Sequence, residues 1–353
     1  MKAAFFSFRS PHFDIRDVET PTIVDGEVLL RVEACGICGT DLNMYRQKFE
    51  TWKSWRMLAL SFASRAGLLR RFSDLSELRL GHEISGTVEE PSKPELHNKK
   101  FVVFPHILCG TCWSCQNGIE TTCEHMSNIG FERAGGFAEY ISVPQKNILE
   151  VSKTLDSSVA TLVEPLACGL HAINIAGVKK NDDILVLGGG TMGQLITNVC
   201  STEYSSKVVV CDPSSFRLET ARRLGATDTV RPDELKSLDT LPEVVFECVG
   251  RQFQTLDAII DIIQPQGTIC IVSHPSGAQY IKLRRLQSKE VQIKTSQGCT
   301  LKNLQDAVTR LESNAAKLRT LITHTFPLEK INEAFSVAIK HKLNNAIKVA
   351  IRS

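Results

Sequence analysis

Residues 183–212 read DILVLGGGTMGQLITNVCSTEYSSKVVVCD, and this stretch decides the fold. It begins with an apolar run at 184–187 that is too short for a helix and is followed by glycines, so it predicts a buried strand. The pattern G-x-G-x-x-G follows at 188–193, and apolar residues at helical spacing continue to Val199. A second apolar run, 208–211, ends at Asp212. Strand, glycine turn, helix, strand and acidic residue in this order predict a dinucleotide-binding unit.

The glycines have separate tasks in such a unit. Gly188 permits a tight turn, Gly190 lets backbone N–H groups approach a pyrophosphate, and Gly193 lets the helix pack on the strand. Met192 lies within the same turn and is expected to contact the cofactor. The phosphates are expected at the helix N-terminus, where unpaired N–H groups and the helix dipole favour anions.

The acidic residue at the end of the second strand predicts which cofactor binds. The carboxylate of Asp212 can accept hydrogen bonds from the ribose hydroxyls of NAD, whereas it would repel the 2′-phosphate of NADP. Arg217 could bind that phosphate, but beside an acidic residue it is expected to stack on the adenine. The alternative is that Asp212 only caps the turn at 213–215. The prediction is therefore NAD.

Length and composition limit the remaining possibilities. A chain of 353 residues is too long for one ordinary core and predicts two domains. Apolar residues make up 42%, charged residues 23%, and the net charge is +2, so composition points neither to nucleic acid nor to an anionic membrane. We expect no signal peptide and no transmembrane span, and hence a cytoplasmic location. Clustered cysteines in such a chain, which has twelve, are expected to be metal ligands.

Four cysteines form one such cluster. Their spacing is C-x2-C-x2-C-x7-C, with glycines nearby to turn the chain, and it involves Cys109, Cys112, Cys115 and Cys123. Four thiolates in a loop-rich segment suit a closed tetrahedral Zn²⁺ site. The alternatives are coincidence or an iron–sulfur cluster, although iron–sulfur proteins use other spacings. We predict structural zinc.

A second candidate site combines different donors. Cys35 and Cys38 form C-x-x-C without a thioredoxin-like context, and Cys35 is expected to be a small buried apolar residue. His82 and Glu83 add an imidazole and a carboxylate. Catalytic zinc takes sulfur, nitrogen and oxygen donors and keeps one position open.

The rest of the chain is organised around these sites. Apolar residues recur at helical spacing within 46–80 and predict an amphipathic helix that covers its own domain, lines a substrate cleft or contacts another subunit. Strands and helices alternate from 183 to 295, which predicts a doubly wound parallel sheet and an α/β fold. The tail from 301 reads as two helices and a strand that return to the first domain.

Together the motifs resemble those of a known family, the zinc-dependent medium-chain dehydrogenases/reductases of the alcohol dehydrogenase superfamily. They occur in the family's order: Cys38-Gly39-Thr40-Asp41, Gly81-His82-Glu83, the four cysteines, Gly135 to Tyr140, Glu164-Pro165 and the glycine pattern. The sequence is most similar to the sorbitol, galactitol-phosphate and threonine dehydrogenase branch. The resemblance implies a mainly β, GroES-like catalytic domain with a zinc lobe at 1–159, completed by 297–353. It implies a Rossmann NAD-binding domain at 160–296.

The resemblance also implies roles for single residues. Cys38 and His82 would bind the catalytic zinc, so that the chain would hold two Zn²⁺ ions. Glu83 would be a ligand in one state and an outer carboxylate in another. Glu164 matches the glutamate of sorbitol dehydrogenase-like relatives and would bind zinc directly or through water. Thr40 resembles the hydroxyl that accepts the proton of the substrate alcohol, and Asp41 the carboxylate that orients the histidine.

The resemblance implies hydride transfer between NAD and a secondary alcohol of a polyol, sugar derivative or cyclitol, in a homodimer or homotetramer. Threonine or a simple alcohol is the alternative substrate. A non-catalytic protein that keeps the fold, or a zinc-free quinone reductase, is less consistent with the intact ligand set. The chain departs from the family at Asn43, where a histidine often relays protons, and in the long segment 46–80.

Overall fold

The computed structural model describes residues 1–7, 10, 12–47, 77–90, 94–250, 255–274 and 281–353. The helix expected within 46–80 falls almost entirely outside these residues. The chain divides into two compact units, and each is discontinuous in sequence. The first contains 1–164, 308–315 and 322–353, and the second contains 165–307 and 316–321. The first unit therefore extends beyond the expected boundary at 159, and 297–307 belong to the second.

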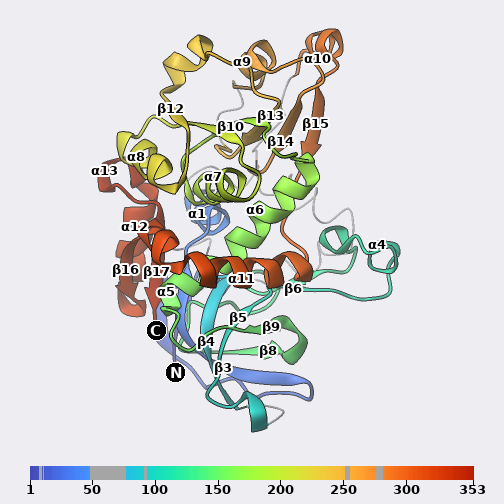
Figure 1. Ribbon diagram of the computed structural model, residues 1–353. Coiled ribbons are helices and arrows are strands. Elements are labelled where there is room, and N and C mark those ends of the chain that lie inside the picture. The colour runs from blue at the N-terminus through green and yellow to red at the C-terminus, as the bar shows by residue number, and fades with distance from the viewer. Residues whose placement is uncertain (8–9, 11, 48–76, 91–93, 251–254, 275–280) are drawn as a thin grey trace. The chain divides into compact units, whose positions relative to one another are not determined.

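The second unit is built on a six-stranded parallel sheet with the strand order β12-β11-β10-β13-β14-β15 (Figure 1). Its strands are β10 (Asp183–Leu187), β11 (Lys207–Cys211), β12 (Asp228–Val230), β13 (Val244–Glu247), β14 (Thr268–Ile271) and β15 (Gln292–Thr295). The register aligns Leu187 of β10 with Cys211 of β11 and Glu247 of β13. The order reverses beside β10, so a ligand is expected at the carboxyl ends of these strands. The predicted doubly wound sheet is confirmed.

Helices precede, connect and follow the strands of this sheet. They are α6 (Val163–Ala176), which begins in the first unit, α7 (Thr191–Glu203), α8 (Ser215–Leu224), η4 (Pro232–Ser237), α9 (Thr255–Ile262), α10 (Leu283–Lys289), α11 (Leu301–Leu318) and η5 (Arg319–Leu321). Alternate residues of β10 serve opposite faces of the sheet. Leu185 and Leu187 pack with residues of α9 and α10, whereas Val186 faces α7. Because both faces are covered, the central strands β10, β11 and β13 are apolar over most of their length.

The first unit is mainly β. Its seven-stranded sheet runs β16-β17-β3-β4-β5-β9, and β8 also pairs with β3. The strands are β3 (Glu27–Gly36), β4 (Glu83–Glu90), β5 (Lys100–Val103), β8 (Tyr140–Pro144), β9 (Ile148–Glu150), β16 (Ile322–Pro327) and β17 (Lys348–Arg352). The tail thus supplies two strands of this sheet: β17, which the sequence pattern predicted, and β16, which it did not. Ala350 of β17 lies opposite Gly36 of β3.

Short elements complete the first unit. Two small antiparallel pairs are β1 (Lys2–Phe5) with β2 (Asp14–Asp17), and β6 (His106–Ile107) with β7 (Ser127–Asn128). The helices are α1 (Gly39–Gln47), η1 (Pro94–Leu96), α4 (Trp113–Gln116), η2 (Glu120–Thr122), η3 (Gln145–Asn147), α5 (Ser157–Ala160), η6 (Leu328–Lys330), α12 (Ile331–Ile339) and α13 (His341–Asn344). Together they make this an α/β protein with a mainly β first unit, as expected.

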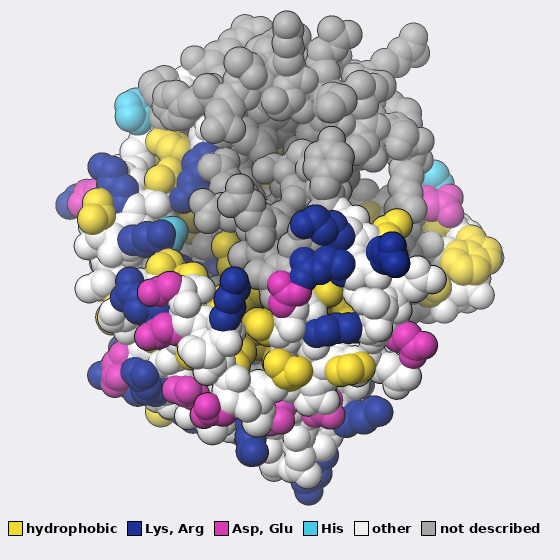
Figure 2. Space-filling model, turned by 90° about the horizontal axis from the view of Figure 1, so that it is seen from above, with side chains coloured by type: hydrophobic (Ala, Val, Ile, Leu, Met, Phe, Trp, Pro, Cys, Tyr) yellow, Lys and Arg dark blue, Asp and Glu magenta, His cyan; other side chains and the backbone are white. Residues whose placement is uncertain are grey.

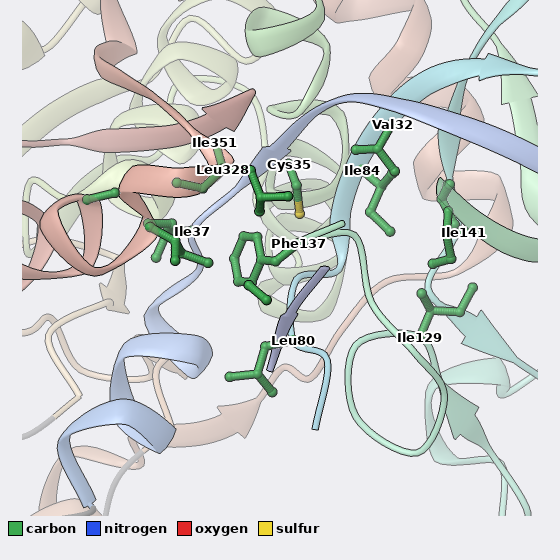
Figure 3. Packing of buried hydrophobic residues seen from close by; sticks show 14 of the residues in the cluster. Val32, Cys35, Ile37, Leu80, Ile84, Ile129, Phe137, Ile141, Leu328 and Ile351 are labelled. Carbon is green, nitrogen blue, oxygen red and sulfur yellow. The ribbon is translucent and has the colours of Figure 1, made fainter. Parts of the chain in front are cut away.

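The core of the first unit lies between its sheet and α12. Figure 3 shows apolar side chains from segments far apart in the sequence, including Val32, Phe137 and Ile351, packed in one cluster. Cys35 lies among them and is fully buried, so the expectation of an apolar role for this thiol agrees with its position. Burial raises the pKa of Cys35 well above the usual range of a thiol.

One helical stretch, residues 157–176, is unusually apolar. Residues 157–176 are long and apolar enough to cross a membrane, although the sequence pattern predicted no such span. In the structure 78% of the most apolar 18-residue part of this stretch is buried, as in a helix of a protein core. On the face shown in Figure 2, lysine and arginine side chains are interspersed with aspartate and glutamate, in keeping with the net charge of +2.

Candidate active site

The four clustered cysteines meet in one loop-rich lobe around α4. The Sγ atoms lie 3.9 Å apart for Cys109 and Cys115, 3.9 Å for Cys112 and Cys123, and 3.6 Å for Cys109 and Cys123. All four lie within 4.8 Å of one another. In a regular tetrahedral site with Zn–S bonds of about 2.3 Å, the sulfur atoms are separated by about 3.8 Å. The lobe therefore fits a single Zn²⁺ ion.

Backbone groups of the lobe favour thiolates at some positions. The N–H groups of Thr111 and Cys112 are directed at the sulfur of Cys109 and lower its pKa to about 5. Burial and then contacts with neighbouring thiols raise the pKa of Cys115 to about 12. Four thiolates so close together repel one another unless a cation lies between them. A bound Zn²⁺ would supply that cation.

The second cluster is assembled by the first unit's sheet. Cys38 follows the end of β3, and Glu83 begins β4 directly after His82. Strand pairing places Gly36 opposite Glu83, which brings the two strand ends together. As a result, ligand atoms of Cys38, His82 and Glu83 lie within 4.8 Å of one another. Thr40 is next to them, with its hydroxyl oxygen 3.7 Å from the Sγ of Cys38.

Asp41 orients this cluster from the first turn of α1. Its Oδ2 accepts a hydrogen bond of 2.9 Å from the backbone N–H of Cys38, and its Oδ1 lies 3.7 Å from Nδ1 of His82. Both Oδ1 and Nδ1 are buried and have no hydrogen-bond partner among the described residues. A metal on the other ring nitrogen, Nε2, would fix the proton on Nδ1, which could then donate to Asp41.

Glu164, the second residue of α6, is not part of the group within 4.8 Å. It is nevertheless close enough to act on His82 through its charge. Burial opposes the protonated imidazole, but Cys38, Asp41 and Glu164 together raise the pKa of His82 well above its usual value. Since a proton and a metal ion compete for the same imidazole, the cluster favours a cation at this position.

Lys348 was not foreseen from the sequence. Its Nζ lies 2.6 Å from both Oε1 and Oε2 of Glu83 and 3.2 Å from the carbonyl oxygen of Ile37. The side chains of Lys348 and Glu83 are 2% and 1% exposed. Burial opposes the charge of the ammonium group, but Glu83 raises the pKa of Lys348 above its usual value. A lone lysine in a strand usually faces water, so the sequence carried no signal for this contact.

The charges of the cluster fit a divalent cation. Asp41, Glu83 and Glu164 are buried carboxylates near the thiol of Cys38, whereas Lys348 supplies one positive charge. Burial raises the pKa of Asp41, which reflects the cost of unpaired negative charge there. Buried charges are tolerated when they are paired or coordinate metals. The donor set of sulfur, imidazole and carboxylate is one that Zn²⁺ accepts.

In the second unit the glycine pattern adopts the conformation expected of it. Gly188 has φ +98, in the left-handed region, and Gly190 is the N-cap of α7. A Cβ atom on Gly193 would lie 1.9 Å from the carbonyl oxygen of Gly188, so only glycine allows this approach. The first turn of α7 includes Thr191 and Met192, and its backbone N–H groups suit a phosphate.

Asp212 holds the glycine turn in place. Its Oδ2 accepts a hydrogen bond of 2.8 Å from the N–H of Gly189, and its Oδ1 accepts one of 2.8 Å from the N–H of Ser214. The turn cap considered as an alternative is therefore present. An ionised carboxylate has about four acceptor positions, so it can still bind ribose hydroxyls. Arg217 lies 3.7 Å from Oδ2. Gln194, also missed in the sequence, donates to the carbonyl oxygens of Gly189 and Arg217.

Two parts of the chain match models of known protein families. Residues 24–153 match the alcohol dehydrogenase GroES-like domain, and residues 192–313 match the zinc-binding dehydrogenase family. The chain belongs to the zinc-dependent medium-chain dehydrogenases. The resemblance indicated by the motifs is thereby confirmed.

Relatives of this dehydrogenase differ in substrate and cofactor. It is 29% identical to an L-threonine 3-dehydrogenase of Bacillus subtilis strain 168, over 92% of this chain and 91% of the relative. It is 24% identical to a scyllo-inosose 3-dehydrogenase of Thermotoga maritima, over 92% of this chain and 87% of the relative. A putative zinc-binding dehydrogenase of Sinorhizobium meliloti, solved with NADP, shares 26% identity with a TM-score of 0.84, and the match covers 100% and 99% of the two chains.

Proposed function

We propose that this dehydrogenase uses Zn²⁺ and NAD to oxidise a secondary hydroxyl group of a polyol, sugar derivative or cyclitol. The observation that carries the proposal is the cluster of the half-buried Cys38 with the buried His82 and Glu83, next to which lies the hydroxyl group of Thr40. A protein that only bound a nucleotide would have no need of a buried set of metal donors.

Each residue of the cluster has a role in this proposal. Cys38 and His82 would hold the metal, Glu83 would be a ligand in one state and an outer carboxylate in another, and Glu164 would bind directly or through water. Bound Zn²⁺ supplies a Lewis acid at this position, and bound NAD supplies the hydride acceptor. Asp41 keeps the imidazole of His82 in one orientation. Thr40 accepts the proton of the substrate hydroxyl. This role is supported by the position of its hydroxyl oxygen, 3.7 Å from the Sγ of Cys38.

The cofactor preference follows from the charge at the end of β11. Asp212 is 4% exposed, so a second negative charge beside it would be only partly screened. Juxtaposed like charges in such a place typically cost several kcal/mol. We therefore propose NAD rather than NADP. One relative was solved with NADP, so this preference is a point to be measured.

The relatives favour two substrate types. The scyllo-inosose 3-dehydrogenase supports a cyclitol or polyol, which is our first choice. The L-threonine 3-dehydrogenase supports the second candidate, L-threonine, whose reacting group is also a secondary hydroxyl. Both substrates require the same metal and hydride chemistry, so the cluster does not discriminate between them.

A direct screen tests the proposal. The zinc-loaded protein is incubated with NAD and, in turn, with polyols, sugar phosphates, cyclitols, L-threonine and simple alcohols, and NADH formation is followed by absorbance. His82→Ala serves as the control that lacks a metal donor. We expect NADH formation by the wild-type protein with a polyol or cyclitol, and none by the variant. Turnover of L-threonine alone would favour the second candidate, and equal rates for both proteins would contradict a role for this metal site.

A further inference from the structure

Glu247, the last residue of β13, joins two turns at the carboxyl edge of the second unit's sheet. It is 1% exposed. Its Oε1 accepts hydrogen bonds from the N–H groups of Val249 at 2.7 Å and Gly250 at 3.1 Å, and its Oε2 accepts one from the hydroxyl group of Ser273. Its backbone carbonyl oxygen accepts from the N–H groups of Val272 and Ser273, at 3.0 and 3.1 Å. One residue therefore ties the turn after β13 to the turn after β14.

The hydrogen bonds of this side chain require an acceptor at both of its oxygens. All three groups that bind it are donors, and a carboxylate can accept on both oxygens without donating. A glutamine would fill the same space but would present N–H donors at one of the two positions. Burial of a carboxylate is costly unless it is hydrogen-bonded. The two turns and the buried carboxylate therefore depend on one another.

Glu247 stands across the sheet's switch point from Asp212. Strand β10 lies between β11, after which Asp212 follows, and β13, which ends at Glu247. A dinucleotide binds across such a switch point, with one nucleotide on each half of the sheet. Because Asp212 suits the ribose of the adenosine half, the half of the sheet that contains Glu247 is left for the nicotinamide nucleotide.

The turn after β13 also lies against the glycine turn. A Cβ atom on Gly188 would be 3.1 Å from the carbonyl oxygen of Cys248. Gly250 has φ +85, in the left-handed region, and a Cβ atom there would be 3.4 Å from the Cβ of Ser273. Val249 is 46% exposed, although its N–H is held by the buried carboxylate. The turn thus presents an apolar side chain beside the expected phosphate site.

We propose that Glu247 is a positioning residue that holds the turns after β13 and β14 in the shape that receives the nicotinamide half of NAD. This inference rests on the proposed function, because it concerns the cofactor of that reaction. The competing explanation is a set of hydrogen bonds that only stabilises the second unit and that the cofactor does not sense.

The experiment compares Glu247→Gln with the zinc-loaded wild-type protein. The Kd for NADH is measured by fluorescence, and calorimetry gives the Kd for ADP, which has the adenosine half and two phosphates but no nicotinamide nucleotide. We expect Glu247→Gln to raise the Kd for NADH about tenfold, as for the loss of a hydrogen bond to a charged group. The Kd for ADP should stay close to that of the wild-type protein, because Asp212 and the glycine turn bind that half.

Two further variants make the comparison specific. Ser273→Ala removes one donor and keeps the carboxylate, so it should raise the Kd for NADH by a smaller factor. Glu243→Gln is the matched control, because Glu243 lies directly before β13, at the opposite end of the strand, and its Oε2 accepts a hydrogen bond of 2.9 Å from the N–H of Asp183. It should leave both dissociation constants unchanged. If Glu247→Gln does not fold, Ser273→Ala provides the test.

The outcomes separate the two proposals. An unchanged Kd for NADH in Glu247→Gln, or in Ser273→Ala if the first variant does not fold, overturns the positioning role. Equal weakening of NADH and ADP binding also overturns it, because such a change would reflect a general loss of structure in the second unit. A wild-type protein that binds neither NADH nor ADP overturns the proposed function, and the positioning role with it.

Discussion

Thr40 and Asn43 lie on the same helix, α1, yet only Thr40 has a hydroxyl group next to the thiol of Cys38. An amide does not change its protonation state near neutral pH, so Asn43 is not expected to relay a proton. We predict that Thr40→Ala lowers kcat about 10²-fold or more, as for a positioned proton-transfer group, and that Asn43→Ala has a modest effect. Steady-state kinetics with the best substrate of the screen would measure both. Equal losses would show that the assignment to Thr40 is wrong.

Asp212 allows a test of cofactor choice at the level of a single charge. The wild-type protein should have a kcat/KM for NAD about 10² times that for NADP, which corresponds to about 3 kcal/mol. Asp212→Asn keeps an oxygen that can accept from Gly189 or Ser214 but removes the negative charge. It should therefore narrow the ratio mainly by improving NADP. A wild-type preference for NADP would instead make Arg217 the determinant.

The roles of single residues differ in how well the amino-acid sequence predicts them. The cysteines of the lobe were recognisable because all four ligands fall within 15 consecutive residues, 109–123, at spacings that a metal requires. Lys348 was not recognisable, because 265 positions separate it from Glu83 and only the pairing of β17 with β3 brings them together. For Asp212 the sequence indicated a carboxylate at the end of a strand, but its hydrogen bond to Gly189 depends on the register of two strands.

At the scale of an element, α5 depends on the cap formed by Asp156. The carboxylate accepts hydrogen bonds from the N–H groups of Ser158 and Val159, at 2.9 and 3.2 Å, and pairs with Arg352 of β17 at 2.8 Å. Burial works against the ionised form, but these partners hold the pKa of Asp156 below its usual range. Because the folded-state pKa is depressed, the stabilisation is present above the pKa of the unfolded chain and is lost as pH falls through the folded-state value.

We predict that Asp156→Asn lowers the Tm at pH 7 by up to roughly 2 °C, because asparagine can still cap α5 but loses the charge that pairs with Arg352, an interaction of up to about 1 kcal/mol. The difference from the wild-type protein should shrink below about pH 4, where the carboxylate becomes protonated. Differential scanning calorimetry over this pH range would measure it, and both proteins share the zinc sites, so the difference isolates Asp156. Asp25→Asn, at an exposed turn of the same unit, is the control. A difference that persists unchanged in acid would contradict the electrostatic cause.

Elements that are local in sequence were the ones best predicted. The glycine turn and α7 follow from a pattern of consecutive residues, and the structure agrees with it down to the close approach at Gly193. The limits of the two units could not be read in the same way. Helix α11 contributes residues to both units, and a periodic pattern of apolar residues gives no sign of where such a division falls.

For the whole molecule we predict two Zn²⁺ ions per chain with different roles. Elemental analysis of the purified protein should find about two, one for each donor set. Cys112→Ser should reduce the yield of folded protein, because binding of structural zinc is coupled to folding. His82→Ala should keep the fold and one zinc but lose turnover. One zinc per chain together with full activity would refute the two-site description.

Because the first unit is discontinuous in sequence, it must complete its fold later in synthesis than the second unit. Residues 165–307, which make up nearly all of the second unit, are continuous in sequence and can form their parallel sheet during synthesis. The first unit cannot, because β17 and the ammonium group of Lys348 emerge last and pair with β3, which was made more than 300 residues earlier. Until then the carboxylate of Glu83 lacks the counter-charge that it has in the folded protein. We therefore expect a chain that stops before β17 to contain every residue of the dinucleotide unit and to lack the ion pair of Glu83.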